Sequence, residues 1–462
     1  MDSMNGLCAG RGPVHAASLL PELVAANLDG ARVGLPSICS AERLVQEAAV
    51  VQALRDDTVL CVESTCNQVN QYGGYTGMTP AAFRARLEAI AVELGLPHAR
   101  LIVGGDHLGP YPWRHEPAAA AMAAAAELVR ACVLAGYTKI HLDASMRLGG
   151  DAGGDGAALD ERLATQRTAE LCRIAEEARA ELPPGSPAPI YVIGTEVPTP
   201  GGEQAGAERV SVTPVDGAKR TLTLTQAAFD EAGLGDTWER VIALVVQPGV
   251  EFGDQAVHDY DPRAAAALSA FVAGRRPPAP AGHPLVYEAH STDYQTPASL
   301  ARLVADHFAI LKVGPALTFA VREALFALEE IERELLARRH GLEPSRLRAT
   351  LDRAMVEQPE HWRAYYSGDE DELALARAFS FSDRARYYWA EPRVRDAVER
   401  LFDNLGHARI PPPLLSQFLP AEYSAVRAGQ SATGPADLVR HRVLTVIDAY
   451  AEACGMRVGE QF

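Results

Sequence analysis

The chain has 462 residues, a formal net charge of −17 and a hydrophobic content of 48%. This charge argues against nucleic acid and anionic membranes as partners, because both require a basic protein surface. The seven cysteines include no C-x-x-C pair, which is typical of reduced thiols rather than of a disulfide framework or a zinc knuckle. The N-terminus shows no secretory leader. We therefore expect a cytoplasmic globular protein.

The elements expected along the chain alternate between strands and helices. Eight short apolar runs bounded by Gly, Pro or polar residues predict strands at residues 33–40, 58–64, 100–105, 138–143, 190–195, 241–247, 285–289 and 309–313. Segments with helical periodicity lie between and after them, at residues 41–55, 80–95, 117–135, 159–181, 264–273, 298–307 and 317–337. Most of the strands are apolar on both faces, as parallel strands covered by helices are.

Eight strand–helix units predict a closed (β/α)₈ TIM barrel over residues 10–340. The alternative is an open doubly wound sheet, which usually carries a G-x-G-x-x-G turn after a strand, and this chain has none. The alanine-rich stretch 117–134 contains Glu127 and Arg130, so we expect a helix packed closely on the sheet and not a membrane span.

Three segments fall outside the repeat. Residues 149–156 form a Gly-rich but acidic loop without the Lys of a phosphate cradle. Residues 198–225 are expected to form a long loop and a polar stretch, which at a barrel mouth is more often a lid or a subunit contact than filler. Residues 341–462 are helical and rich in Arg, Trp and Tyr. This extension either covers one side of the barrel or forms the interface of a homo-oligomer.

The stretch 101–110 is the most informative. An apolar strand is followed by Gly104 and Gly105, which are expected to let the backbone turn, and then by Asp106 and His107. These two residues present a proton acceptor and a metal ligand at the end of a strand, where the reactive groups of a barrel lie. A single Asp-His pair is also compatible with a simple strand-end cap.

Six of the eight predicted strands end in His, Asp or Glu. Because gathering so many ionisable groups costs desolvation and like-charge repulsion, a bound divalent cation is expected among them. His107 and His290 are the candidate imidazole ligands, with one or two carboxylates from Glu251 and Glu196. Mixed His and carboxylate ligands suit Zn²⁺, Mn²⁺, Co²⁺ or Ni²⁺.

Proton transfer is assigned to carboxylates beside this site, with Asp106, Glu196 and Asp143 as the candidates. Polar residues at the other strand ends are candidate substrate ligands. They are Asn70, Gln71, Ser145, Gln247, Asp293 and Lys312.

Several long motifs then make the chain recognisable. They include NQYGGYTGMTP at 70–80, GGDHLGP at 104–110, KIHLDASM at 139–146, YVIGTEVP at 191–198, VQPGVEF at 246–252, YEAHSTDYQT at 287–296, ILKVGPALTF at 310–319 and SFSDRARYYW at 380–389. The chain resembles the GatZ/KbaZ-like family, described as the non-catalytic subunit of class II D-tagatose-1,6-bisphosphate aldolase. The resemblance implies a TIM barrel with distant similarity to the catalytic class II aldolases. In those enzymes an Asp-His pair after the third strand supplies the acid/base and a zinc ligand, which matches Asp106 and His107, and a further histidine follows the seventh strand, which matches His290.

The chain departs from the catalytic aldolases at two places. Where they have a Gly- and Ser-rich phosphate-binding turn after the seventh strand, this chain has residues 291–295 with the acidic Asp293. Where they have a further histidine at the sixth strand, the candidate here is Glu251, Gln247 or neither. Metal binding is thus compatible with the sequence, whereas tight bisphosphate binding is doubtful.

The resemblance implies two functions. Some members of the family are metal-dependent ketohexose 4-epimerases that interconvert D-tagatose and D-fructose, and retro-aldol cleavage at C3–C4 would suit these residues without a nucleotide. The alternative is a subunit that stabilises a separate catalytic aldolase chain. The expected small-molecule partner is accordingly a ketose or a ketose phosphate.

Overall fold

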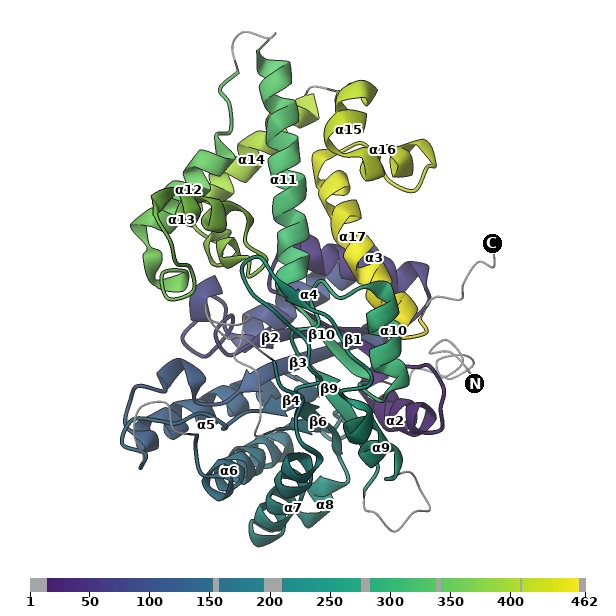
Figure 1. The fold of residues 1–462 in the computed structure, drawn as a ribbon, viewed down its shortest axis with the longest axis vertical. Helices are drawn as coiled ribbons and strands as arrows, with labels where there is room; N and C mark the ends of the chain where they lie inside the picture. Colours follow the sequence, from purple (N-terminus) through teal and green to yellow (C-terminus); the bar gives the residue numbers. More distant parts are fainter. Residues whose placement is uncertain are drawn as a thin grey trace.

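The protein is described by a computed structural model covering residues 15–152, 158–194, 210–275, 283–337, 342–407 and 409–456. Eight parallel strands close into a barrel in the order β1-β10-β9-β6-β5-β4-β3-β2 (Figure 1). They are β1 (Leu35–Cys39), β2 (Leu60–Thr65), β3 (Leu101–Leu108), β4 (Lys139–Leu142), β5 (Ile190–Ile193), β6 (Val241–Val246), β9 (Val286–Ala289) and β10 (Ile310–Val313). The predicted TIM barrel is confirmed.

Helices alternate with the barrel strands. They are α2 (Leu20–Leu28), α3 (Arg43–Arg55), α4 (Pro80–Leu94), α5 (Ala118–Leu134), α6 (Glu161–Ala180), α7 (Val215–Glu231), α8 (Gly235–Trp238), α9 (Ala266–Ala273), α10 (Pro297–Ala305) and α11 (Pro315–Leu336). The remaining strands, β7 (Glu251–Phe252) and β8 (Val257–His258), form a short antiparallel hairpin after β6. Among the described residues, no helix is both long and apolar enough to cross a membrane.

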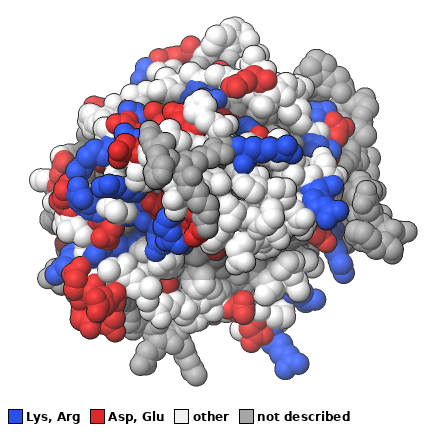
Figure 2. All heavy atoms as spheres, turned by 90° about the horizontal axis from the view of Figure 1, so that it is seen from above, with Lys and Arg blue, Asp and Glu red and all other residues white. Residues whose placement is uncertain are grey.

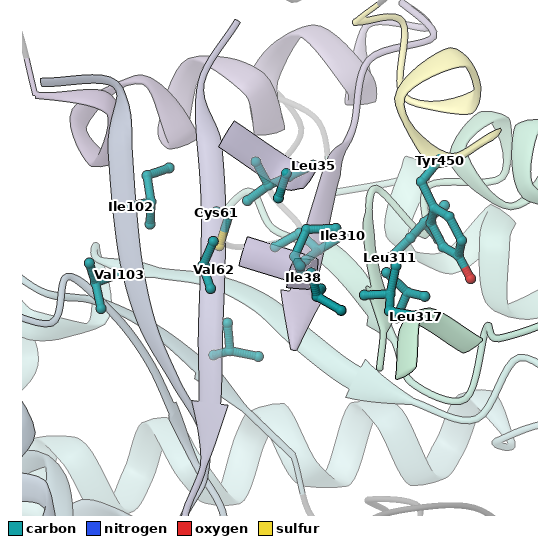
Figure 3. Packing of buried hydrophobic residues seen from close by; sticks show 14 of the residues in the cluster. Leu35, Ile38, Cys61, Val62, Ile102, Val103, Ile310, Leu311, Leu317 and Tyr450 are labelled. Carbon is teal, nitrogen blue, oxygen red and sulfur yellow. The ribbon is translucent and has the colours of Figure 1, made fainter. Parts of the chain in front are cut away.

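Continuous apolar strands build the core because both of their faces are covered. Figure 3 shows Leu35 and Ile38 of β1 beside Val62 of β2 and Ile310 of β10, all of them fully buried. The alanine-rich α5 contributes Ala121 and Ala125 to this core as small buried residues, so it lies close to the sheet as expected.

Two local expectations were wrong. The backbone does not turn at Gly104 and Gly105, because β3 continues through them to Leu108. Gly104 is instead required by a close approach, since a Cβ there would lie 2.6 Å from an oxygen of the Glu63 carboxylate. Residues 215–225, the last part of the predicted loop and polar stretch at 198–225, instead form the start of α7, because one face of this helix is buried despite its helix-disfavouring threonines.

The C-terminal extension contains α12 (Leu347–Glu357), α13 (Glu370–Phe379), α14 (Pro392–His407), α15 (Pro412–Phe418), α16 (Pro420–Arg427) and α17 (Pro435–Ala453). Figure 1 shows α12 to α14 on one side of the long α11 and α15 to α17 on the other. Helix α17 returns to the barrel and contacts α3, α10 and α11. The extension therefore covers one side of the barrel, while the division at residues 340 and 341 and the homo-oligomer stay predictions.

A buried ion pair fixes the segment between α13 and α14 on α11. Asp383 adopts a left-handed backbone conformation (φ 43°), accepts a hydrogen bond from Thr318 Oγ1 at 2.6 Å, and lies 3.3 Å from Arg322 Nε. Both partners of the ion pair are about 2% exposed. The 3₁₀ helix η6 (Arg384–Tyr388) follows directly and brings its side chains to the barrel mouth.

We expect Asp383→Ala to lower the free energy of unfolding by about 3–5 kcal/mol, because it leaves the Arg322 guanidinium buried without its carboxylate. Urea unfolding followed by circular dichroism measures this. The control is Glu357→Ala, which removes a half-exposed partner of Arg393 and should cost less than about 1 kcal/mol. Equal effects of the two substitutions would contradict the assigned role of Asp383.

Candidate metal centre at the barrel mouth

A cavity of about 770 Å³ opens at the carboxyl ends of the barrel strands. Its floor is formed by Cys39 at the end of β1, Asp106 and His107 on β3, His290 after β9, and Lys312 on β10. Tyr75, Arg386, Tyr387 and Trp389 line it further out, so the C-terminal extension contributes to the same cavity. Reactive groups of barrel enzymes lie at this face.

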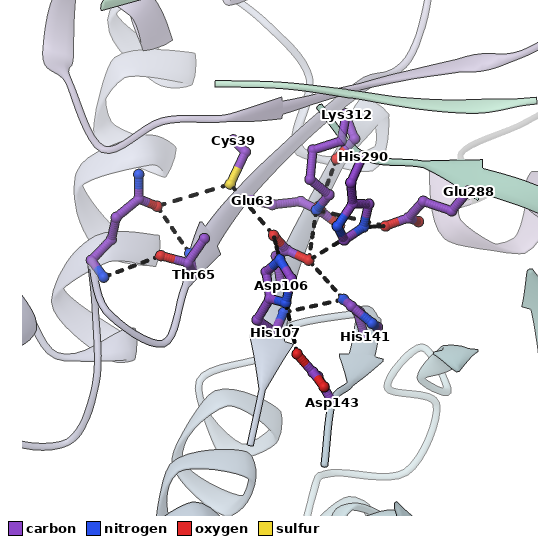
Figure 4. A network of polar contacts seen from close by, with 12 residues as sticks. Cys39, Glu63, Thr65, Asp106, His107, His141, Asp143, Glu288, His290 and Lys312 are labelled. Atoms are coloured by element: carbon purple, nitrogen blue, oxygen red, sulfur yellow. Dashed lines mark hydrogen bonds and ion pairs between the residues drawn. The ribbon is translucent and has the colours of Figure 1, made fainter. Parts of the chain in front are cut away.

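The end of β3 is irregular where the two central residues lie. The register between β3 and β4 shifts between Gly105 and Leu108, and His107 has a positive φ of 48°. A bulge of this kind redirects side chains, and strained backbone of this kind is concentrated at functional sites. Here it turns the side chains of Asp106 and His107 toward the same group of residues (Figure 4).

Three imidazoles meet in this group. The ring centroids of His107, His141 and His290 lie 4.9 to 5.2 Å from one another. Carboxylates orient two of the rings, since His107 Nδ1 lies 2.8 Å from Asp143 Oδ2 and His141 Nδ1 lies 2.7 Å from Asp106 Oδ1. These contacts leave Nε2 as the ring nitrogen through which either imidazole would bind a cation.

The donor set fits a metal ion. Ligand atoms of Asp106, His141, Glu288 and His290 all lie within 4.8 Å of one another, and these four residues are buried. His141 Nε2 is itself buried and has no hydrogen-bond partner in the described part of the chain. A buried imidazole nitrogen without a partner is costly, and a divalent cation would satisfy it.

A network of buried charges surrounds the imidazoles. Lys139 Nζ lies 2.6 Å from carboxylate oxygens of both Glu63 and Glu288. Lys312 Nζ pairs with Glu63 and lies 2.8 Å from Asp106 Oδ1. With Asp143 included, four buried carboxylates face two buried lysines, which leaves an excess of negative charge beside the imidazoles.

The ionisation of these groups follows from this environment. Burial alone would raise the pKa of Asp106, but the charges of His107 and Lys312 hold it well below its usual range. Burial would also raise the pKa of Asp143, but the hydrogen bond with His107 opposes this effect, and the pKa falls to about 2. Burial lowers the pKa of His290 to about 4, so this imidazole is neutral and available as a ligand at neutral pH.

Of the predicted substrate residues, Asp293 and Lys312 line the cavity. The others do not line it and bond to nearby groups instead. Asn70 and Gln247 accept hydrogen bonds from backbone N–H groups of their own loops, Gln71 donates to a carbonyl of α5, and Ser145 donates to Asp143. These four residues shape loops around the mouth.

One predicted carboxylate ligand, Glu251, lies outside the four-residue group. It lies on the β7–β8 hairpin, where Oε1 accepts a hydrogen bond from the Phe252 N–H. Glu196 lies outside the described residues.

The sequence interpretation missed His141 as a ligand, together with the buried Glu63, Lys139 and Glu288. The alternation of polar and apolar residues within a strand could have identified some of them. Lys139 and His141 alternate with Ile140 and Leu142 along β4, which places the two polar side chains on the same face of the strand. Charged residues inside otherwise apolar barrel strands therefore indicated a polar interior.

Comparison with known proteins agrees with this architecture. The family model described as D-tagatose-1,6-bisphosphate aldolase subunit GatZ/KbaZ-like matches residues 20–455. The chain belongs to this family. A crystal structure titled as a probable tagatose 6 phosphate kinase from Sinorhizobium meliloti 1021 is similar to this GatZ/KbaZ-like chain at 43% identity and a TM-score of 0.81, covering 91% of this chain and 100% of that one.

More remote similarities extend to two enzyme structures. Fructose-bisphosphate aldolase from Campylobacter jejuni shares 13% identity and a TM-score of 0.45, over 86% of this chain and 94% of that one. Fructuronate-tagaturonate epimerase from Cohnella laeviribosi shares 10% identity and a TM-score of 0.45, over 92% and 81% of the two chains. Both similarities are too remote to bear on the activity of this chain.

Proposed function

We propose that this GatZ/KbaZ-like chain is a metal-dependent ketohexose 4-epimerase that interconverts D-tagatose and D-fructose. The observation that carries the proposal is the meeting of three imidazoles with Asp106, since His107, His290 and Asp106 line one cavity and the buried His141 lies directly beside them. His141 and His290, which belong to the four-residue group, would hold Zn²⁺, Mn²⁺, Co²⁺ or Ni²⁺ together with the adjacent imidazole of His107, and His141 replaces Glu251 in this ligand set. When bound, the cation supplies Lewis acidity that polarises a carbonyl and stabilises negative charge on oxygen.

Asp106 is the group placed to move a proton. Its carboxylate lines the cavity and is held in the ionised form, so it can accept the proton of the C4 hydroxyl. The C4–O bond then becomes a carbonyl as the C3–C4 bond breaks, and the bond electrons pass into the C2–C3 half as an enediolate. Rotation of the aldehyde and addition to its other face inverts C4, and Asp106 returns the proton to the C4 oxygen.

The other predicted carboxylates receive different roles. Asp143 is a positioning residue, because it bonds His107 Nδ1 and Ser145. Lys312 holds Asp106 and faces the cavity, where its ammonium stabilises negative charge on substrate oxygens. Glu196 remains a second candidate for the proton acceptor.

The proposed chemistry predicts that the hydrogen at C4 stays on carbon. Protein stripped with a chelator and reloaded with each of the four cations should convert D-[4-²H]tagatose to D-[4-²H]fructose without added nucleotide, with full retention of deuterium. Nuclear magnetic resonance measures conversion and label together. Activity in the stripped protein equal to that of the reloaded protein, or deuterium lost to solvent, would contradict this mechanism.

The family description favours a second candidate, a subunit that stabilises a separate catalytic aldolase chain. Under this proposal the purified chain shows no conversion with any cation, forms no aldol product from dihydroxyacetone phosphate and glyceraldehyde 3-phosphate, and raises the activity or stability of a catalytic aldolase partner. The same preparation tests both candidates.

A further inference from the structure

A carboxylate of the chain itself occupies one wall of the cavity where the seventh and eighth barrel strands end. Asp293 follows β9, and its Oδ1 accepts hydrogen bonds from the backbone N–H groups of Gly314 at 3.0 Å and Ala316 at 2.8 Å. These two N–H groups lie at the start of the 22-residue helix α11, directly after β10. Asp293 is only 2% exposed, yet it lines the cavity.

In barrels of this type, this position is a common site for binding an anionic group of the substrate. Loops after the seventh and eighth strands, with a helix N-terminus, frequently bind the phosphate of a substrate, because free N–H groups and the helix dipole favour an anion. Here both N–H groups already have an anionic partner. A substrate phosphate at this wall would meet a buried like charge, and neither of these two N–H groups would be free to donate to it, which opposes its binding.

The backbone around Asp293 is strained to place it there. Ser291 and Tyr294 both have positive φ values, of 53° and 63°, which non-glycine residues adopt only at a cost. Tyr294 is held in this conformation by a hydrogen bond from its hydroxyl to the Phe381 carbonyl at 2.6 Å. Contacts from the barrel and from the C-terminal extension therefore hold the segment that carries the Asp293 carboxylate.

We propose that Asp293 determines substrate specificity, because its carboxylate accepts a hydrogen bond from a substrate hydroxyl at this wall and excludes a phosphate. The site then binds a ketose whose end facing α11 is not phosphorylated. This inference rests on the proposed function, because it names the substrate class of the same cavity. A hydroxyl can donate to the second carboxylate oxygen, whereas the dianion of a phosphate ester has no proton to donate and repels the carboxylate. A purely structural cap of α11 would affect free and phosphorylated ketoses alike.

The test compares the metal-loaded wild-type chain with Asp293→Ala, Asp293→Asn and the matched control Glu42→Gln. Glu42 also lines the cavity and also caps a helix, since its side chain accepts a hydrogen bond from the Leu44 N–H at the start of α3. The probes are D-tagatose, D-tagatose 6-phosphate and D-tagatose 1-phosphate for kcat/KM, and inorganic phosphate in calorimetric titrations.

The wild-type chain and Glu42→Gln should prefer the free ketose to the better phosphate ester by about 100-fold, and Asp293→Ala should reduce or reverse this ratio and tighten inorganic phosphate binding by at least about 10-fold. Asp293→Asn should show a smaller change in the same direction, because its amide oxygen still accepts the two N–H groups. If Asp293→Ala fails to fold, the substrate preference and phosphate affinity of Asp293→Asn test the proposal in its place.

Comparable use of both substrate classes by the wild-type chain overturns the inference and leaves the epimerase proposal standing. So does unchanged phosphate affinity in the folded Asp293 variants, or an equal response to Glu42→Gln. If no variant turns over any ketose, the phosphate titration still decides: tighter binding in Asp293→Ala supports the role of Asp293, although the proposed epimerase activity has failed.

Discussion

Replacing His141 by alanine is expected to weaken binding of the divalent cation by more than about 100-fold, beyond the range typical of residues that only orient a ligand. The reason is that His141 Nε2 is buried, has no other hydrogen-bond partner in the described part of the chain, and faces two further imidazoles. Equilibrium dialysis with elemental analysis measures the affinity, and epimerase activity should fall with the bound metal.

The control for this substitution is His98→Ala, which removes a half-exposed imidazole just before the start of β3, at the opposite end of that strand from Asp106 and His107. It should leave metal content and activity unchanged. An unaltered metal affinity in a folded His141→Ala protein would show that the three imidazoles do not share a cation. His107→Ala provides a second, independent test of the same ligand set.

Replacing Lys139 by methionine is expected to lower the free energy of unfolding by about 3–5 kcal/mol. Its ammonium is fully buried and lies 2.6 Å from carboxylates of both Glu63 and Glu288, so its removal leaves uncompensated negative charge inside the barrel. Guanidinium unfolding of the metal-free protein isolates this effect from metal binding.

Lys219→Met is the matched control, because Lys219 makes an exposed ion pair with Asp216 at 3.6 Å. Exposed pairs of this kind contribute no more than about 1 kcal/mol. Equal free energies of unfolding for the two lysine variants would show that the buried ion pairs of Lys139 with Glu63 and Glu288 do not stabilise the barrel interior.

Much of the fold was predictable because strand and helix periodicities are local. Eight apolar runs and the helical segments between them were sufficient for the barrel, and β1 to β6 begin and end within a few residues of the expected positions. The wrong prediction at residues 215–225 has a physical cause. Threonine disfavours a helix in isolation, whereas burial of one face of α7 against the barrel outweighs that preference.

The site was predictable only in part. Asp106, His107 and His290 could be chosen because each follows or ends an apolar strand, and the structure brings them together. The roles of His141 and Glu251 depend on which way a side chain points at a given register. The alternation along β4 places His141 on the same face as Lys139, beside the other imidazoles, while Glu251 lies on the β7–β8 hairpin and accepts a hydrogen bond from the Phe252 N–H.

The interior network could not be read from spacing, because Glu63, Lys139 and Glu288 come from strands distant in sequence and meet only when the barrel closes. Asp293 was noticed in the sequence, but its hydrogen-bond partners could not be predicted. Its acidic side chain was recognised as unusual for a phosphate-binding turn, but only the structure shows which N–H groups it occupies.

The proposed binding of a divalent cation by buried imidazoles at the barrel mouth can be observed by anomalous diffraction from crystals grown with Mn²⁺ or Co²⁺. We predict one strong peak enclosed by His107, His141 and His290, next to Asp106. Peaks only at other positions, with these imidazoles bonded to protein or water alone, would contradict the account.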